Sequence, residues 1–188
     1  MVFTHQEVEP FILRRGASST EWEMTPANLV NIPSYNFSHD GDPTNDEPVW
    51  SNTRGWPGVC TFFQQRLWFA GSTYKPNSVW ASKINAYFDF DIGDGQDDFG
   101  IFDTISSEQY NKIVNIYSGR NLQVFTTGSE FYNIADFVTP SNSIWKRSTS
   151  YGSKRVQPVM IDGSVLFTDY IGRTIRESVY DYNEDAYV

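Results

Sequence analysis

The chain has 188 residues, 39% hydrophobic and 16% aromatic, a composition typical of one β-rich globular domain. Its 14 basic and 23 acidic residues give a net charge of −9, which argues against high-affinity or sequence-specific nucleic-acid binding, because that requires a positive surface. The single cysteine, Cys60, excludes an internal disulfide and any multi-cysteine metal site.

No apolar run approaches the roughly 20 residues of a membrane-spanning helix, so we expect no membrane span. The first residues lack the basic region and apolar core of a secretion signal. We therefore expect a protein that is made and assembled in the cytoplasm.

In chain order, residues 1–24 predict one or two strands, with alternation at Val2–His5, an apolar run at Phe11–Leu13 and a turn at Gly16–Thr20. Residues 26–57 show little periodicity and are rich in Pro, Asn, Asp and Ser, which predicts a long irregular loop.

Irregular connections of this length usually carry function or contact a partner. Within this loop, deletion of Ser38–Glu47 is expected to remove no strand.

The stretch from Pro48 to Ser82 is the one around which the rest is organised. A turn segment, Trp50–Pro57, precedes three β-rich runs at Val59–Phe63, Leu67–Gly71 and Val79–Ser82, the pattern of an antiparallel meander. Its aromatic residues can bury enough area to nucleate a sheet core. The residues of this structural motif are Trp50, Arg54, Gly55, Trp56, Pro57, Gln65, Arg66, Leu67, Phe69, Gly71 and Trp80.

Residues 58–188 contain three similar units, each with a strand centred on a phenylalanine and preceded by a tight turn. The centres, Phe69, Phe125 and Phe167, are separated by 56 and 42 residues. The second spacing matches a propeller blade of roughly 40–45 residues, and the first matches a blade with an insertion at 89–109. Helical periodicity is scarce, and at most one turn fits at 107–112. The sequence therefore predicts an all-β fold of repeated meanders, either a partial or open propeller or a β-sandwich.

The acidic run at residues 89–98 suggests a calcium loop, in which Asp89, Asp91 and Asp94 are the candidate ligands. Calcium takes about six to eight oxygen ligands, and Asp-rich loops with glycines can supply them. The EF-hand template fails here, because Gly93 and Gly100 occupy two of its ligand positions. The alternative is a solvated surface loop without metal.

The sequence carries no recognisable catalytic motif, so we expect no enzyme and no cofactor. A carboxylate pair such as Asp94 and Glu130 would suit a glycosidase, but any pair is arbitrary among 23 acidic residues. The two histidines, His5 and His39, both lie near polar turns and make a weak metal pair.

Three arginines, Arg54, Arg66 and Arg176, stand beside aromatic residues in the sequence. They can be stacking or contact sites, or strand-end arginines that pair with carboxylates between neighbouring sheets. The tyrosines and tryptophans can likewise form a sugar-binding face, although strand alternation explains most of them as core.

The motif stretch resembles a known family, through Trp50-Ser51, Arg54-Gly55-Trp56-Pro57, Gln64-Gln65-Arg66-Leu67-Trp68-Phe69-Ala70-Gly71 and Trp80-Ala81-Ser82. These residues are similar to the tail nozzle proteins of short-tailed bacteriophages, also called tail tubular protein B, and to the related phage DNA-stabilisation proteins. Weaker similarity extends to Val2–His5 and to Asp185–Tyr187.

The resemblance implies a propeller-like structural protein of the virion tail, assembled in the host cytoplasm, through which DNA is retained and ejected. It implies a ring of identical subunits that contacts a tail adaptor and fibre or spike proteins. It also implies that residues 1–188 are the N-terminal part of a longer propeller-like protein. A carbohydrate- or receptor-binding β module and a propeller hydrolase are the alternatives.

Overall fold

A computed structural model describes residues 1–106 and 111–188. Within these residues the chain forms antiparallel strands and a single three-residue 3-10 helix, η1 (Pro43–Asn45), so the predicted all-β fold is confirmed. No helix in the described part of the chain is long and apolar enough to cross a membrane. The turn expected at 107–112 and the end of the insertion at 89–109 fall partly outside these residues.

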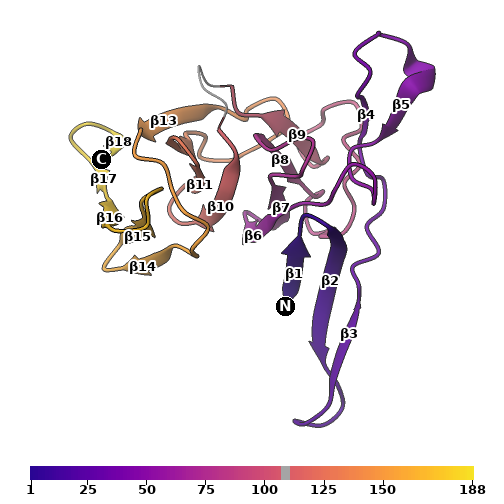
Figure 1. Cartoon of the computed structure of the whole chain (residues 1–188), viewed down its shortest axis with the longest axis horizontal. Helices are drawn as coiled ribbons and strands as arrows, with labels where there is room; N and C mark the ends of the chain where they lie inside the picture. The colour runs from indigo at the N-terminus through magenta and orange to yellow at the C-terminus, as the bar shows by residue number, and fades with distance from the viewer. Residues whose placement is uncertain (107–110) are drawn as a thin grey trace.

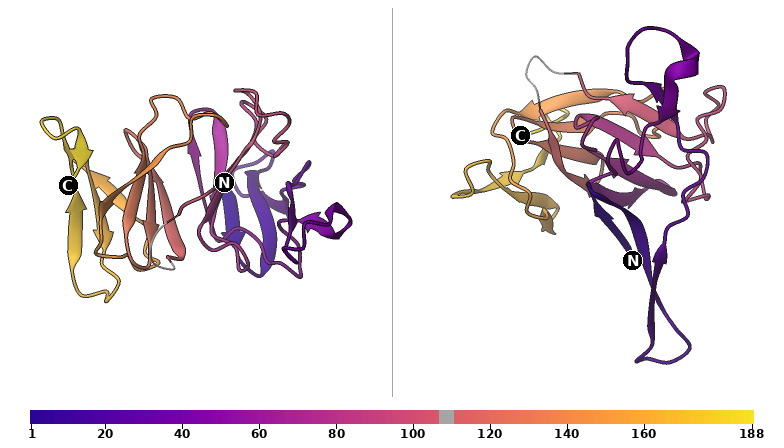
Figure 2. Two further views of the ribbon diagram at one scale, coloured as in Figure 1. Left: turned by 90° about the horizontal axis from the view of Figure 1, so that it is seen from above. Right: turned by 45° about the vertical axis from the view of Figure 1, so that its right-hand side comes forward.

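Three successive antiparallel sheets form the body of the molecule, and each takes its strands in sequence order. The first contains β6 (Val59–Phe63), β7 (Arg66–Ala70), β8 (Ser78–Ala81) and β9 (Ile101–Thr104). The second contains β10 (Ile113–Ser118), β11 (Leu122–Thr126), β12 (Glu130–Asn133) and β13 (Trp145–Thr149). The third contains β14 (Val159–Ile161), β15 (Ser164–Thr168) and β16 (Ile175–Ser178). Seen from above, the sheets lie side by side in chain order (Figure 2).

Tight turns set the register of these sheets. Gln64 and Gln65 both have positive φ, as do Asp162 and Gly163, so β6–β7 and β14–β15 are joined by two-residue hairpin turns. Asp-Gly suits this conformation, because glycine has no Cβ penalty at positive φ and aspartate tolerates it better than most residues.

The N-terminal strands form two further sheets outside the three sheets of the body. Strands β1 (Val2–His5), β2 (Val8–Arg15) and β3 (Trp22–Pro26) form one sheet, and β4 (Ser34–Asn36) pairs with β5 (Asp46–Pro48). Figure 1 shows that the β2–β3 hairpin extends well beyond the body, while the β4–β5 hairpin projects the opposite way. At the other end of the chain, β17 (Tyr180–Asp181) pairs with β18 (Ala186–Tyr187).

Two expectations for the N-terminal part are wrong. Residues 1–24 contribute to three strands rather than one or two, and residues 26–57 include the β4–β5 hairpin. The polar residues that suggested a loop hydrogen-bond to one another: the Asp40 carboxylate accepts hydrogen bonds from Asn36 Nδ2 at 2.9 Å and Asn45 Nδ2 at 2.7 Å. Deletion of Ser38–Glu47 would therefore remove two residues of β5.

Hydrophobic clusters cover both faces of the first sheet. Strand β7 is fully buried, and successive side chains along a strand point to opposite faces. On one face Trp68 joins Ile116 and Val124 in the core between the first and second sheets. On the other face, Phe69 lies with Trp50 and Trp80. A smaller cluster around Phe125, Val165 and Phe167 joins the second and third sheets.

Candidate functional site

The apolar motif residues gather in the outer core of the first sheet. Trp50 is surrounded by three rings, with centroid distances of 5.5 Å to Phe69, 5.1 Å to Trp80 and 5.0 Å to Phe90, all in edge-on geometry. Leu67 and Trp56 belong to the same cluster. The turn segment and the meander thus share one aromatic core, although they are separated in the sequence.

The small and turn-forming motif residues permit close backbone approach. Gly55 has φ of +79°, and a Cβ there would lie 2.5 Å from Thr73 Oγ1. Gly71 has φ of +64°, and a Cβ would lie 2.9 Å from the Ile113 carbonyl oxygen. Pro57, at the end of the turn segment Trp50–Pro57, is buried, whereas Gln65 is exposed at the β6–β7 turn.

One residue that the sequence did not single out, Gln6, connects the motif to the N-terminal sheet. Its carbonyl accepts a hydrogen bond from the Trp56 amide at 2.8 Å, and its Nε2 donates to the Gly71 carbonyl at 2.9 Å. Lys112 Nζ donates to Gln6 Oε1 at 3.0 Å. No sequence signal marks Gln6, because it lies in a short polar turn with ordinary composition.

Arg54 both pairs with an acid and stacks on aromatic rings. Its Nε donates to Glu47 Oε1 at 2.9 Å, and its guanidinium lies 4.3 Å from the Phe37 centroid and 5.0 Å from that of Tyr74. The hydrogen bond from Arg54 lowers the pKa of Glu47. These contacts fasten β5 to the turn segment, so the side chain acts within the chain.

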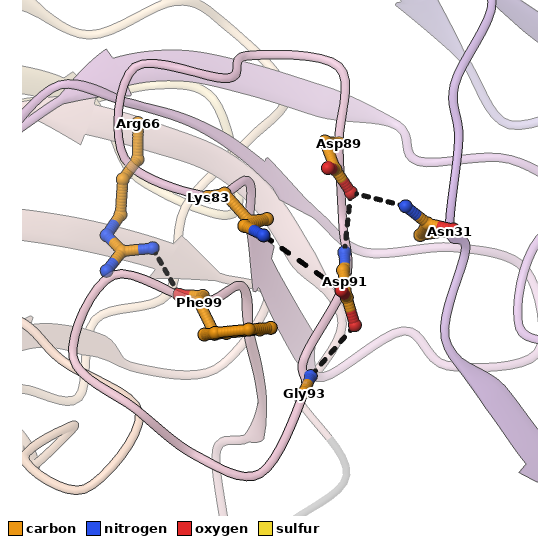
Figure 3. A network of polar contacts seen from close by, with 7 residues as sticks. All are labelled: Asn31, Arg66, Lys83, Asp89, Asp91, Gly93 and Phe99. Carbon is orange, nitrogen blue, oxygen red and sulfur yellow. Dashed lines mark hydrogen bonds and ion pairs between the residues drawn. The ribbon is translucent and has the colours of Figure 1, made fainter.

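Arg66 is the centre of a polar network, and its environment differs from both expectations. The side chain is only 1% exposed, and Nη1 donates to the Ser82 carbonyl at 2.7 Å and to the Phe99 carbonyl. Nη2 donates to the Asp97 carbonyl. Arg66 therefore neither stacks on a ring nor pairs with a carboxylate between sheets. It holds both ends of the loop between β8 and β9, and Figure 3 shows the contact with Phe99. Burial lowers the pKa of Arg66. The negative charges of Asp98 and Asp97 act in the other direction and raise it, but by less.

Two of the three calcium candidates lie close together in this loop (Figure 3). Asp89 Oδ1 accepts hydrogen bonds from Asn31 Nδ2 at 2.9 Å and from the Asp91 amide at 3.1 Å. Asp91 Oδ1 accepts from the Gly93 amide at 2.9 Å, and its Oδ2 lies 4.0 Å from Lys83 Nζ. These carboxylates therefore serve to shape the loop.

Asp94 is exposed in the same loop. Within the ranges that the structure describes, no three His, Cys, Asp or Glu side chains are grouped so that they could hold a metal ion. His5 is the last residue of β1, and His39 lies between β4 and η1.

Glu130, the other half of the considered carboxylate pair, is buried in the second sheet. It is 3% exposed, and it accepts hydrogen bonds from Thr149 Oγ1 at 2.6 Å, the Tyr151 amide at 3.2 Å and Ser153 Oγ at 2.9 Å. Its oxygens anchor the segment after β13, while Asp94 lies in a loop of the first sheet. The geometry gives no support to a catalytic pair of these two residues.

Arg176 stacks on a ring of its own chain. Its guanidinium carbon lies 3.5 Å from the Tyr151 centroid, the geometry of a cation–π contact. Among the tryptophans considered for a sugar-binding face, Trp50, Trp68 and Trp80 are fully buried. The exposed aromatic residues are spread along the described chain and include Trp22, Phe137, Tyr170 and Tyr182.

No family model matches the chain, and a search of curated proteins finds no match to it.

Proposed function

We propose that the chain is a structural component of a short bacteriophage tail, part of the nozzle through which DNA is retained and ejected. The observation that carries the proposal is the convergence of the motif residues Trp50, Phe69 and Trp80 on one core. The residues behind the resemblance to tail nozzle proteins thus act together as a structural unit. In this proposal the three successive meanders are blades of an open, propeller-like array, and the chain is the N-terminal part of a longer protein.

Two separate apolar surfaces suit assembly into a ring. The β2–β3 hairpin exposes Trp22 by 61% and Met24 by 57%, on an arm that extends beyond the body (Figure 1). The third sheet exposes Val159, Ile161 and Ile175, and Ile175 is 71% exposed. Exposed apolar patches commonly mark interaction surfaces. Two different patches on one subunit favour head-to-tail contacts, which close into rings when the rotation between subunits allows it.

The partners in this proposal are identical subunits in the ring, a tail adaptor, and fibre or spike proteins. The location is the virion tail, after assembly in the host cytoplasm. The net charge of −9 suits a conduit that must let DNA slide, because acidic walls repel phosphates.

The proposal is tested by the association state of the purified chain. We expect concentration-dependent rings in multi-angle light scattering and negative-stain electron microscopy. Trp22→Ser and Ile175→Ser should each weaken association about tenfold or more, because large apolar anchors dominate interfaces. Phe137→Ser is the matched control, since Phe137 is at least as exposed but lies in the loop between β12 and β13.

A monomer at every concentration would contradict the proposal. Equal loss of association in the Phe137→Ser control would show that the two surfaces have been misassigned.

A further inference from the structure

A cavity of about 490 Å³ lies where the second and third sheets meet the C-terminal strands. Its size falls within the range of small-molecule sites, roughly 300–1,000 Å³. Its lining includes Arg120, Gln123, Met160, Asp162, Tyr180 and Tyr182. These residues come from the β10–β11 turn, β11, β14, the β14–β15 turn, β17 and the turn after it, so several elements converge on one space.

One wall of the cavity is aromatic. Tyr180 has centroid distances of 5.2 Å to both Tyr182 and Tyr187, in edge-on geometry. The Arg120 guanidinium lies 4.4 Å from the Tyr180 centroid and 5.1 Å from that of Tyr182, and its Nη1 donates to Tyr182 Oη at 3.1 Å. These contacts orient the guanidinium before any ligand arrives, which reduces the entropy cost of binding.

Gln123, another lining residue, has an unsatisfied donor. The residue is 3% exposed on β11, an inner strand of its sheet, and its Nε2 has no hydrogen-bond partner among the described residues. A buried donor without a partner is unusual in a native structure and is unfavourable. Gln123 Nε2 is closed off from solvent, and a ligand oxygen in the cavity would satisfy this donor after a rotation of the Gln123 side-chain amide toward the cavity.

The charges around the cavity favour a neutral ligand. Arg120 is offset by Asp162 in the same lining, and Asp185 accepts a hydrogen bond from the Tyr180 hydroxyl nearby. The chain as a whole has a net charge of −9, so its long-range electrostatic field repels anions.

We propose that this cavity binds a neutral saccharide unit. A sugar ring offers an apolar C–H face, which suits the tyrosine wall, and hydroxyls that can both accept and donate hydrogen bonds. In this arrangement one hydroxyl accepts from Gln123 Nε2 and another donates to the Asp162 carboxylate. The site is independent of ring assembly, because it involves neither the β2–β3 arm nor the outer face of the third sheet.

The test is titration of the full chain by calorimetry and by ligand-observed NMR. The neutral probes are the methyl glycosides of glucose, galactose and mannose, N-acetylglucosamine, and maltose. The anionic probes are glucuronate and inorganic phosphate. We expect at least one neutral probe to bind with a Kd of about 10 mM or tighter, and the anionic probes to bind more weakly.

Two variants connect binding to this cavity. Gln123→Leu should weaken binding about tenfold or more while leaving the melting temperature unchanged or higher, because it removes an unsatisfied buried donor and keeps the volume. Tyr182→Ala should weaken binding by a similar factor without a large loss of stability, since Tyr182 is 77% exposed. Tyr170→Ala is the matched control, an exposed tyrosine outside the lining, and should leave binding unchanged.

Three results would overturn the proposal. The first is the absence of binding by every neutral probe up to about 10 mM. The second is sugar binding that neither Gln123→Leu nor Tyr182→Ala weakens. The third is preferential binding of phosphate or glucuronate, which would make this an anion site governed by Arg120.

Discussion

Replacement of Arg66 by methionine tests whether one buried guanidinium organises the loop between β8 and β9. Methionine keeps much of the aliphatic volume but removes every donor. The change leaves the Ser82 carbonyl unpartnered in a buried environment, and the Phe99 and Asp97 carbonyls unpartnered in part-buried ones. An unsatisfied buried polar group costs about 1–3 kcal/mol, and water can reach the two part-buried carbonyls. We therefore expect a loss of about 3–5 kcal/mol in the free energy of unfolding, similar to other broken buried charge networks.

Urea denaturation followed by tryptophan fluorescence measures this loss, and thermal unfolding should show a melting temperature lower by roughly 6–20 °C. Arg173→Met is the matched control, because Arg173 is exposed, and it should change stability by no more than about 0.5 kcal/mol. A loss of less than about 1 kcal/mol for Arg66→Met would refute the reasoning, since it would mean that water replaces the guanidinium at all three carbonyls.

Three further predictions concern the core, the acidic loop and the β4–β5 hairpin. Phe69→Ala should cost about 3–5 kcal/mol, whereas Asp94→Ala should cost under about 0.5 kcal/mol in the same urea titration; equal effects would contradict the core assignment. EDTA should leave the melting temperature unchanged, because Asp89 and Asp91 already accept hydrogen bonds within the chain; a fall that calcium reverses would show a metal site. The Thr44 amide and hydroxyl lower the pKa of Asp42 below its ordinary value of 3.8. Its contribution to stability is therefore present above pH about 4 and lost as the pH falls through the lower folded-state pKa. An NMR titration of the Thr44 amide that reports a pKa at or above the ordinary value would contradict this.

The sequence predicts well those parts of the fold that depend on local pattern. The apolar run around Phe69 places it in the core, and the Asp162–Gly163 pair marks a hairpin turn, because both signals lie within a few residues. The β4–β5 hairpin escapes this reasoning, since its polar residues are stabilised by side-chain contacts among Asn36, Asp40 and Asn45. Composition alone cannot distinguish polar residues that hydrogen-bond to one another from polar residues of a solvated loop.

The environments of the site residues depend on contacts between distant segments of the chain. The sequence does not predict these contacts. Arg66 follows a turn, a position typical of an exposed strand end, yet a loop that ends more than thirty residues later closes over it. Gln123 looks like an ordinary polar strand residue, and only the packing of the C-terminal strands turns it into a buried donor beside a cavity.

The central proposal is a structural role in a phage tail, and it requires that a phage genome encodes the chain. Electron microscopy of particles of such a phage tests it most directly. Particles grown with the gene are compared with particles grown without it. We expect heads without the gene product to fill with DNA but to carry truncated tails and to lose DNA or infectivity. Complete tails and normal infection in the absence of the gene would contradict the proposal.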